Sequence, residues 1–400
     1  MNSTSTYSDR WNAVMMPNYG TPPIALDHGQ GVRVWDTDGN SYLDFVGGIA
    51  VSSLGHAHPA LVAAVTSQVA KLAHTSNLAM HEPGIALAER LVGMVGIPAR
   101  VFFANSGAEA NECAIKLVRK AGNSTDRHEI VSCNASFHGR TMGALSLTGT
   151  EAKRAPFEPL PGPVTFVDYG DVDALRAAVG PNTAAVFVEP TLGEGGVVPP
   201  PSGFLRDVRK ICTDADALMV VDEVQSGIGR TGHWLASLAD GVRPDVITLA
   251  KGLGGGLPIG ACIGIGAAGE IFAPGDHGST FGANPVSCAA ALAVIDTIAG
   301  QHLLDDVKRV GEYLSRAIDS LGSPLVAGVR GSGLWRGVQL VRPVASVVEA
   351  SARSHGLLVN AVKPDALRLA PPLILTETEV DEAMPALAAA LNDAEGEAPS

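Results

Sequence analysis

The chain has 400 residues, and its 28 basic and 41 acidic side chains give a formal net charge of −13. This acidic balance excludes nucleic acid and an anionic membrane as main partners, since both bind basic surfaces. Hydrophobic residues make up 46% of the chain and charged residues 17%, so we expect a folded protein with a large core rather than a disordered one.

The first 60 residues are expected to hold a short helix and a β-hairpin. The hairpin strands are Val32–Asp36 and Ser41–Phe45, which flank an Asp38-Gly39-Asn40 turn. The extreme N-terminus is polar and shows no hydrophobic signal segment. The five cysteines are odd in number and contain no CxxC pair, so we expect no disulfide framework, no metal site and a cytoplasmic location.

From about residue 60 to 270, short apolar runs alternate with amphipathic helical stretches such as residues 110–118. The runs are rich in β-branched residues and do not alternate with polar ones, a pattern typical of strands covered on both faces. We therefore predict an α/β fold with a mostly parallel, seven-stranded sheet. The predicted strands are Val101–Ala104, Glu129–Cys133, Val164–Val167, Ala185–Val188, Leu218–Val221, Val246–Ala250 and Cys262–Ile265.

From about residue 285, Ala- and Leu-rich helices precede strand-like pieces at Val329–Leu340 and Leu357–Leu369. Asp381–Glu397 is predicted to be a solvated terminal helix. We expect residues 1–60 and 285–400 to form a smaller α+β domain beside a large domain at residues 61–284.

One uncharged stretch has nearly the length of a membrane span. It comprises the 18 residues between Lys251 and Glu270, of which eight are glycine and one is Pro258. Such a composition does not favour a continuous helix, so no membrane span is expected.

A strand-to-helix junction lies at residues 101–112. Ser106 and Glu109 have the spacing of a capping box, and Gly107 and Ala108 leave the backbone N–H groups of the helix start uncovered. Such a helix start binds phosphate groups, although a purely structural cap is the alternative interpretation.

Asp222 follows a buried strand at its carboxyl end, the edge at which open α/β sheets bind ligands. A structural carboxylate that caps the next turn is the alternative. The nearby glycines at 227, 229 and 232 match the dinucleotide fingerprint formally. Because the acidic residues precede them and no βαβ unit follows, a nicotinamide dehydrogenase is only a weak alternative.

Lys251 ends the next predicted strand and is followed by glycines. A lysine desolvated there would have a lowered pKa and could form a Schiff base, whereas a lone lysine at a strand end more often extends to solvent. Together, a phosphate-binding helix start, Asp222 and Lys251 are what pyridoxal phosphate requires. Lys251 would condense with its aldehyde, and Asp222 would keep its pyridine nitrogen protonated.

Ten ordered motifs carry a resemblance to one family. They are NYGTPP at 18–23, GGIAV at 47–51, LGHAHP at 54–59, NSGAEAN at 105–111, FHGRT at 137–141, EPTLGEGG at 189–196, DEVQ at 222–225, KGLGGG at 251–256, HGSTF at 277–281 and RLAPPL at 368–373. On these motifs the chain resembles the class III pyridoxal-phosphate aminotransferases over nearly its full length. Within that family it is most similar to actinobacterial members that act on N2-acetylornithine.

The resemblance implies the type I fold of pyridoxal-phosphate-dependent transferases and a homodimer with shared active sites. Lys251 and Asp222 would be catalytic. Thr280 would reach the phosphate, and Ser279 the substrate, from the second subunit. The implied cofactor-binding residues are Ser106, Gly107, Ala108, Phe137, Asp222, Glu223, Val224, Gln225, Lys251 and Thr280.

The implied reaction is a ping-pong transfer of an amino group from N2-acetylornithine to 2-oxoglutarate, giving glutamate, in arginine biosynthesis. Arg368 would hold the α-carboxylate of glutamate or 2-oxoglutarate, and Arg140 the α-carboxylate of acetylornithine or the side-chain carboxylate of glutamate. Glu194 resembles a gate that pairs with an arginine in one half-reaction only. The alternatives are ornithine, succinylornithine, succinyldiaminopimelate or 4-aminobutyrate as substrate, or a non-catalytic scaffold subunit.

The chain departs from the family pattern at two positions. Ala79 stands where an aromatic residue usually follows Ser-Asn-Leu. The site wall that contacts the substrate's acyl group is therefore expected to differ from that of the family, and with it the acyl preference. Ala283 replaces a frequent glycine.

Overall fold

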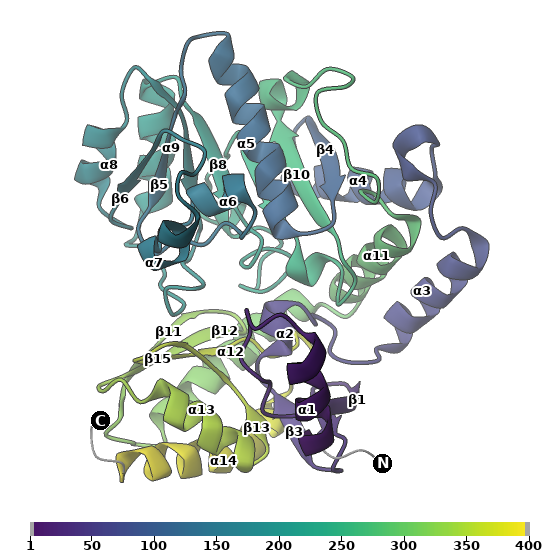
Figure 1. Cartoon of the computed structure of the whole chain (residues 1–400), viewed down its shortest axis with the longest axis vertical. Coiled ribbons are helices and arrows are strands. Elements are labelled where there is room, and N and C mark those ends of the chain that lie inside the picture. Colours follow the sequence, from purple (N-terminus) through teal and green to yellow (C-terminus); the bar gives the residue numbers. More distant parts are fainter. Residues whose placement is uncertain (1–3, 397–400) are drawn as a thin grey trace.

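The structure, a computed structural model that describes residues 4–396, is built around a seven-stranded sheet (Figure 1). The strand order is β4-β10-β9-β8-β7-β5-β6. β10 pairs antiparallel with β4 and β9, whereas the other pairings are parallel, which confirms the predicted mostly parallel sheet. The strands are β4 Ala99–Ala104, β5 Glu129–Cys133, β6 Val164–Val167, β7 Thr183–Val188, β8 Leu218–Asp222, β9 Val246–Leu249 and β10 Gly260–Ile265.

Helices cover both faces of this sheet, which explains its uninterrupted apolar strands. On one face, the core around α5 (Gly107–Asn123) includes Phe187 of β7. On the other face, the core around α9 (Phe204–Asp214) includes Val186 and Val188 of the same strand. The predicted apolar stripe of α5 is buried as expected; it comprises Ala110, Cys113, Ala114, Leu117 and Val118.

Segments from both ends of the chain meet in a second lobe, the lower one in Figure 1. The predicted hairpin is present as β2 (Arg33–Asp36) and β3 (Ser41–Asp44), and β13 (Leu357–Leu358) pairs parallel with β3. We therefore propose that residues 1–60 and 285–400 form the smaller domain. The lobe also contains β1 Leu26–Gln30, β11 Val326–Ser332, β12 Trp335–Leu340, β14 Asn360–Lys363, β15 Ala366–Leu369, α2 Gly47–Ala50, α12 Leu303–Asp319, α13 Ala345–Ser354 and α14 Glu377–Glu395.

The expectation of a solvated terminal helix is wrong for α14. Its residues Val380, Met384, Leu387 and Leu391 are buried in the core. They recur every three or four positions, so they form one apolar stripe despite the acidic residues between them. Of the predicted range, Glu397 lies outside the described residues.

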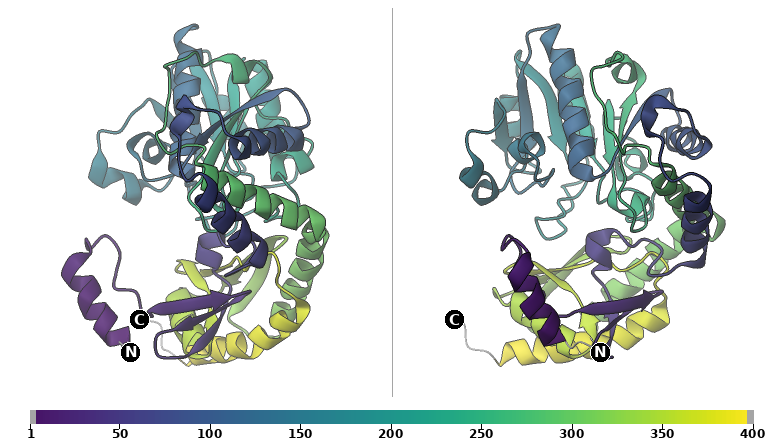
Figure 2. Two further views of the ribbon diagram at one scale, coloured as in Figure 1. Left: turned by 90° about the vertical axis from the view of Figure 1, so that its right-hand side faces the viewer. Right: turned by 45° about the vertical axis from the view of Figure 1, so that its right-hand side comes forward.

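Helix α11 (Pro285–Gly300) lies between the two lobes, as Figure 2 shows, and packs against α3 (Pro59–Lys71) and α4 (Glu82–Val95). Within residues 4–396, no single helix is both long and apolar enough to cross a membrane. Only α11 and α12 satisfy those criteria jointly, as a pair bent by 72°.

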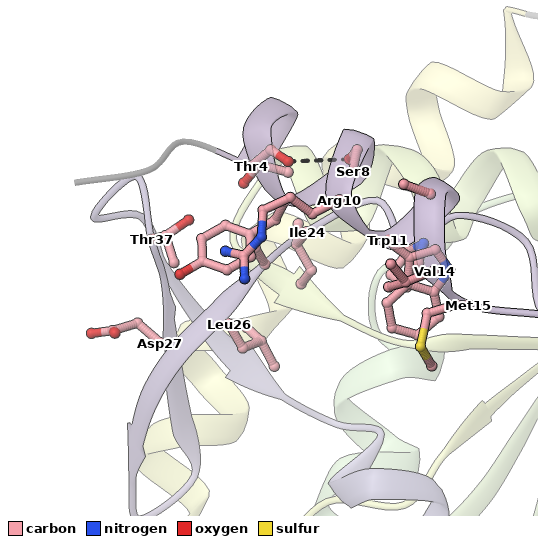
Figure 3. A pocket seen from close by; sticks show the side chains of 14 residues that line it. Thr4, Ser8, Arg10, Trp11, Val14, Met15, Ile24, Leu26, Asp27 and Thr37 are labelled. Carbon is pink, nitrogen blue, oxygen red and sulfur yellow. Dashed lines mark hydrogen bonds between the residues drawn. The ribbon is translucent and has the colours of Figure 1, made fainter.

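Helix α1 (Thr4–Val14) stands apart from the rest of the second lobe in Figure 2 and contains no buried residue. A cavity of about 650 Å³ lies beneath it, and Figure 3 shows its lining, which includes Trp11 of the helix and Ile24 and Leu26 opposite. Apolar side chains thus join α1 to the start of β1, and hydrogen bonds also hold the helix: the Thr4 N–H donates to Asp38 Oδ2 at 3.2 Å, and Thr21 Oγ1 donates to Asn12 Oδ1 at 2.6 Å.

Candidate active site

A second cavity, of about 410 Å³, lies at the carboxyl ends of β8 and β9, where open α/β sheets bind ligands. It joins the end of β8, the start of α5 and the loop after β5. Most of the site residues expected from the sequence line it: Ser106, Gly107, Ala108, Phe137, Arg140, Asp222, Val224, Gln225 and Lys251.

The start of α5 forms one wall of this cavity. Ser106 is the N-cap, and its Oγ accepts a hydrogen bond from the Glu109 N–H at 3.2 Å. A Cβ at position 107 would lie 2.8 Å from Val224 Cγ1, so glycine is required there. The open N–H groups and the positive end of the helix dipole favour an anion.

The expected capping box is only half formed. The Glu109 carboxylate accepts from the backbone N–H and the side-chain amide of Asn105, at 2.6 and 2.8 Å, instead of from the Ser106 N–H. Glu109 therefore orders the turn that precedes the helix, and the Ser106 N–H is not engaged by that carboxylate.

Asp222 is held as a buried carboxylate facing the cavity. Its Oδ2 accepts hydrogen bonds from Asn111 Nδ2 at 2.7 Å and His138 Nδ1 at 2.8 Å, and its Oδ1 accepts from the Val224 N–H at 2.9 Å. Burial alone would lower the pKa of His138, but the hydrogen bond and charge of Asp222 outweigh it and raise the pKa. The His138–Asp222 pair thus fixes a negative charge where it meets the cavity.

Lys251 reaches the same cavity from the end of β9. Burial, and then the charge of Arg368, lower the pKa of its amine to about 8. Its backbone lies in the left-handed region with a φ of 45°, which is strained for a residue with a side chain. Strain of this kind collects at functional sites, and here it aims an amine of lowered pKa into the cavity.

Arg368 lies beside this cavity, on β15, and is buried. Its Nη1 donates to Glu194 Oε1 at 2.7 Å and to Gln225 Oε1 at 3.2 Å, while Nη2 donates to Asn360 Oδ1 at 2.7 Å. Burial would raise the pKa of Glu194, but the charge of Arg368 outweighs it and lowers the pKa. The structure therefore brings two of the four predicted substrate residues, Arg368 and Glu194, together as an ion pair.

Arg140 is exposed at the mouth of the cavity, with its guanidinium 5.6 Å from the centre of the Phe137 ring. Ser279 and Thr280 do not line the cavity of this chain. Ser279 Oγ accepts from Asn105 Nδ2 at 3.2 Å and from the Gly282 N–H at 2.9 Å, whereas Thr280 is exposed.

The structure does not place Glu223 in the cavity, contrary to the expectation that it binds the cofactor. Its buried carboxylate accepts hydrogen bonds from Ser226 Oγ at 2.6 Å, from the Ala236 N–H at 3.0 Å, and from the N–H and Oγ of Ser237 at 2.7 and 2.8 Å. Consecutive side chains of extended backbone point in opposite directions, so Asp222 faces the cavity and Glu223 faces away.

The glycine fingerprint at residues 227–232 lies within the loop that Glu223 holds. It precedes α10 (Ala236–Ala239), a four-residue helix, and does not open a long helix after a strand. The dinucleotide interpretation therefore lacks the structural setting it needs.

Sequence reasoning missed several residues around the site. Asn111 was detectable, because it lies one helical turn after Ala108 on α5. His138 stood inside a quoted motif, but only the fold brings it to Asp222. Glu189 also lines the cavity. Burial raises the pKa of its carboxyl to about 7, although the charge of His138 opposes this effect; the charge of Asp222 adds to it.

Comparisons with known proteins agree with this geometry. Residues 14–391 match the family model described as aminotransferase class-III. The acetylornithine aminotransferase of Mycolicibacterium smegmatis is 57% identical over 389 residues, which cover 97% of this chain and 99% of that protein.

Two solved structures are similar over both lobes. The N-acetylornithine aminotransferase from Stenotrophomonas maltophilia K279a is 38% identical with a TM-score of 0.82, covering 94% of this chain and 97% of that one. The ornithine aminotransferase from Toxoplasma gondii ME49 is 32% identical with a TM-score of 0.94, covering 100% of this chain and 97% of that one. The chain therefore has the fold of these enzymes.

Proposed function

The chain belongs to the class III aminotransferases, and we propose that it transfers the terminal amino group of N2-acetyl-L-ornithine to 2-oxoglutarate. The family assignment confirms the resemblance of the motifs and makes the protein a pyridoxal-phosphate-dependent transaminase of fold type I. The proposed products are N-acetylglutamate semialdehyde and glutamate, as a step of arginine biosynthesis.

The residues of the cavity fit pyridoxal 5'-phosphate. Two buried polar atoms at its wall, Asn111 Oδ1 and His138 Nε2, have no hydrogen-bond partner within residues 4–396. Ser106, Gly107 and Ala108 bring the N-terminal end of α5 to the cavity wall, where backbone N–H groups suit a phosphate. When bound, the cofactor supplies an aldehyde that exchanges amines and a ring that withdraws electrons from the substrate.

We assign the chain's own residues as follows. Ser106, Gly107 and Ala108 would hold the phosphate, and Asp222, oriented by His138, would hold a proton on the pyridine nitrogen. Lys251 Nζ would bind the cofactor's aldehyde and, once released, would move a proton at the substrate carbon that bears the amino group. Phe137, Val224 and Gln225 line the cavity; Phe137 and Val224 would hold the ring between them, and Gln225 would donate a hydrogen bond to it.

One observation carries the substrate proposal: an amine of lowered pKa and the Arg140 guanidinium line one cavity, and the Arg368 guanidinium lies directly beside it. Arg140 lies at its mouth, and Arg368 is hydrogen-bonded to Gln225 of its wall. A guanidinium pairs bidentately with a carboxylate. Two guanidinium groups suit a dicarboxylate such as 2-oxoglutarate. Acetylornithine has a single carboxylate, so one guanidinium suffices for it while its terminal amine reaches Lys251.

A panel of amino donors with 2-oxoglutarate tests this proposal. We expect kcat/KM for N2-acetylornithine to exceed that for ornithine by at least about tenfold, because the free α-amine of ornithine adds a cation that must be desolvated beside Arg140. The panel includes N2-succinylornithine, succinyldiaminopimelate and 4-aminobutyrate. A preference for ornithine or 4-aminobutyrate would overturn the substrate assignment while leaving the transaminase assignment intact.

We propose that the working enzyme is a homodimer. Leu78 and Met80 are 96% and 91% exposed, and Phe281 beside them is 60% exposed. The segments are adjacent, because Asn77 Nδ2 donates to the Gly282 carbonyl at 3.1 Å. These exposed apolar side chains on adjacent segments, next to Thr280, suit contact with a second copy, to which Ser279 and Thr280 would be offered.

Light scattering during gel filtration should give twice the chain mass of 41.0 kDa. The double variant L78D/M80D is expected to shift the protein to monomer and lower activity at least about tenfold, because a charge buried at an interface is costly. The variant V341D, on another exposed apolar residue, serves as the control and should stay dimeric. A wild-type monomer with full activity would contradict the proposal.

We also propose a cytoplasmic location. All five cysteines, at 113, 133, 212, 262 and 288, are buried free thiols, as expected of a chain that folds in a reducing compartment.

A further inference from the structure

Glu194 lies between two cations. Its Oε1 accepts from Arg368 Nη1 at 2.7 Å, and its Oε2 lies 3.5 Å from Lys153 Nζ. The side chains of Glu194 and Lys153 are only 24% and 25% exposed, whereas that of Arg368 is almost fully buried. One carboxylate therefore balances two cations at the edge of the cavity.

Lys153 is held in this place by more than Glu194. It lies on the short helix α7 (Glu151–Arg154), and its Nζ stands 4.8 Å from the centre of the Phe137 ring. Burial lowers its pKa; Glu194 opposes this effect and Arg140 adds to it. A lysine without a task at the site would extend its ammonium group to solvent, but this one points inward over the ring.

The arrangement has a consequence for any substrate that uses Arg368. Because Glu194 and Gln225 share Nη1 and Asn360 accepts from Nη2, a substrate carboxylate that binds across the two terminal nitrogens of Arg368 must displace Glu194. A half-buried carboxylate without a cation is unfavourable. Lys153, already beside the other oxygen of Glu194, is the cation that remains.

We propose that Lys153 is a positioning residue that retains the Glu194 carboxylate when Arg368 binds the α-carboxylate of glutamate or 2-oxoglutarate. Before the substrate binds, the Glu194 carboxylate faces both Lys153 and Arg368. After binding, Glu194 pairs with Lys153, and the substrate carboxylate pairs with Arg368. The inference rests on the proposed role of Arg368 as the clamp for that half-reaction. It makes Lys153 a determinant of which substrates the site accepts, without contact to the reacting atoms.

The variant Lys153→Met tests this role, since methionine keeps much of the side-chain volume and removes the charge. We expect kcat/KM for 2-oxoglutarate and for glutamate to fall about tenfold, while kcat/KM for N2-acetylornithine changes less than about twofold. In ping-pong kinetics kcat/KM is obtained separately for the substrate of each half-reaction. Lys153→Arg should restore most of the loss, and Lys210→Met, at an exposed pair with Asp214, is the matched control.

A binding measurement provides a readout without turnover. Glutarate, a dicarboxylate with no amine, is titrated calorimetrically into the holoenzyme. We expect its dissociation constant to rise about tenfold in Lys153→Met and less than threefold in Lys153→Arg. An unchanged constant would overturn the proposal.

A double-mutant cycle with Glu194→Gln separates positioning from direct substrate contact. If Lys153 acts through the Glu194 charge, Lys153→Met costs less than about twofold once that charge is gone. A tenfold loss that persists in the Glu194→Gln background would overturn the proposal. Equal losses in both half-reactions would also overturn it, because they would indicate a structural role of Lys153 against the Phe137 ring. Inactivity of the wild-type protein towards every amino donor would instead refute the proposed function.

Discussion

Replacing Lys251 with alanine is expected to lower turnover by at least about 10⁴-fold, because one amine both holds the cofactor's aldehyde and moves the proton. The pKa of about 8 for the Lys251 amine matters for binding the aldehyde, because only the neutral amine can condense with it. At pH 7 roughly a tenth of the chains carry the neutral amine, against about one in three thousand for a lysine of ordinary pKa. The measurement is kcat with acetylornithine and 2-oxoglutarate, together with the visible absorbance of the bound cofactor.

Lys251→Arg is the matched variant, since it retains the positive charge but offers no amine that can condense with an aldehyde; it should lose as much activity as Lys251→Ala. Neither variant should unfold, because the substitution to alanine removes a buried cation rather than an apolar contact. Melting temperatures close to that of the cofactor-free wild type would confirm this. Activity above a hundredth of the wild-type value in both variants would contradict the assigned role.

The strands around Lys251 could be predicted because their sequence signal is local. β8 and β9 are short, β-branched and apolar without alternation, a pattern that helices on both faces of a sheet produce. The end of each such strand could therefore be located, and with it Asp222 and Lys251. Parallel neighbours then bring both residues to one edge of the sheet without further information.

The partners of these residues could not be predicted, because they depend on contacts between distant segments. The pairing of Asp222 with His138 requires the loop after β5 to fold over β8, and the contact of Lys153 with Glu194 joins the short helix α7 to the loop after β7. Side-chain direction also decides which residues reach the cavity, since Glu223 follows Asp222 directly and yet faces the opposite way. Residue identity alone does not specify which of two adjacent carboxylates turns towards a ligand.

The surroundings of Asp222 show why an amide cannot replace it. Its Oδ2 accepts from Asn111 Nδ2 and from His138 Nδ1, and its other oxygen accepts from the Val224 N–H. An asparagine side chain has only one oxygen, so its NH₂ group would have to face one of these donors. The fixed negative charge, which favours a proton on the pyridine nitrogen, would also be lost.

We therefore expect Asp222→Asn to lower kcat by about 10³-fold, the scale found when a preorganised charge is removed from an active site. Lys251 remains, so the variant should still bind the cofactor and keep its visible absorbance, which separates loss of electron withdrawal from loss of the cofactor. Asp245→Asn is the control, because that carboxylate pairs with Arg209 and the Met219 N–H outside the cavity; its activity should stay within about threefold of wild type. A cofactor-bound Asp222→Asn variant retaining a tenth of wild-type kcat would show that the ring needs no anion at this position.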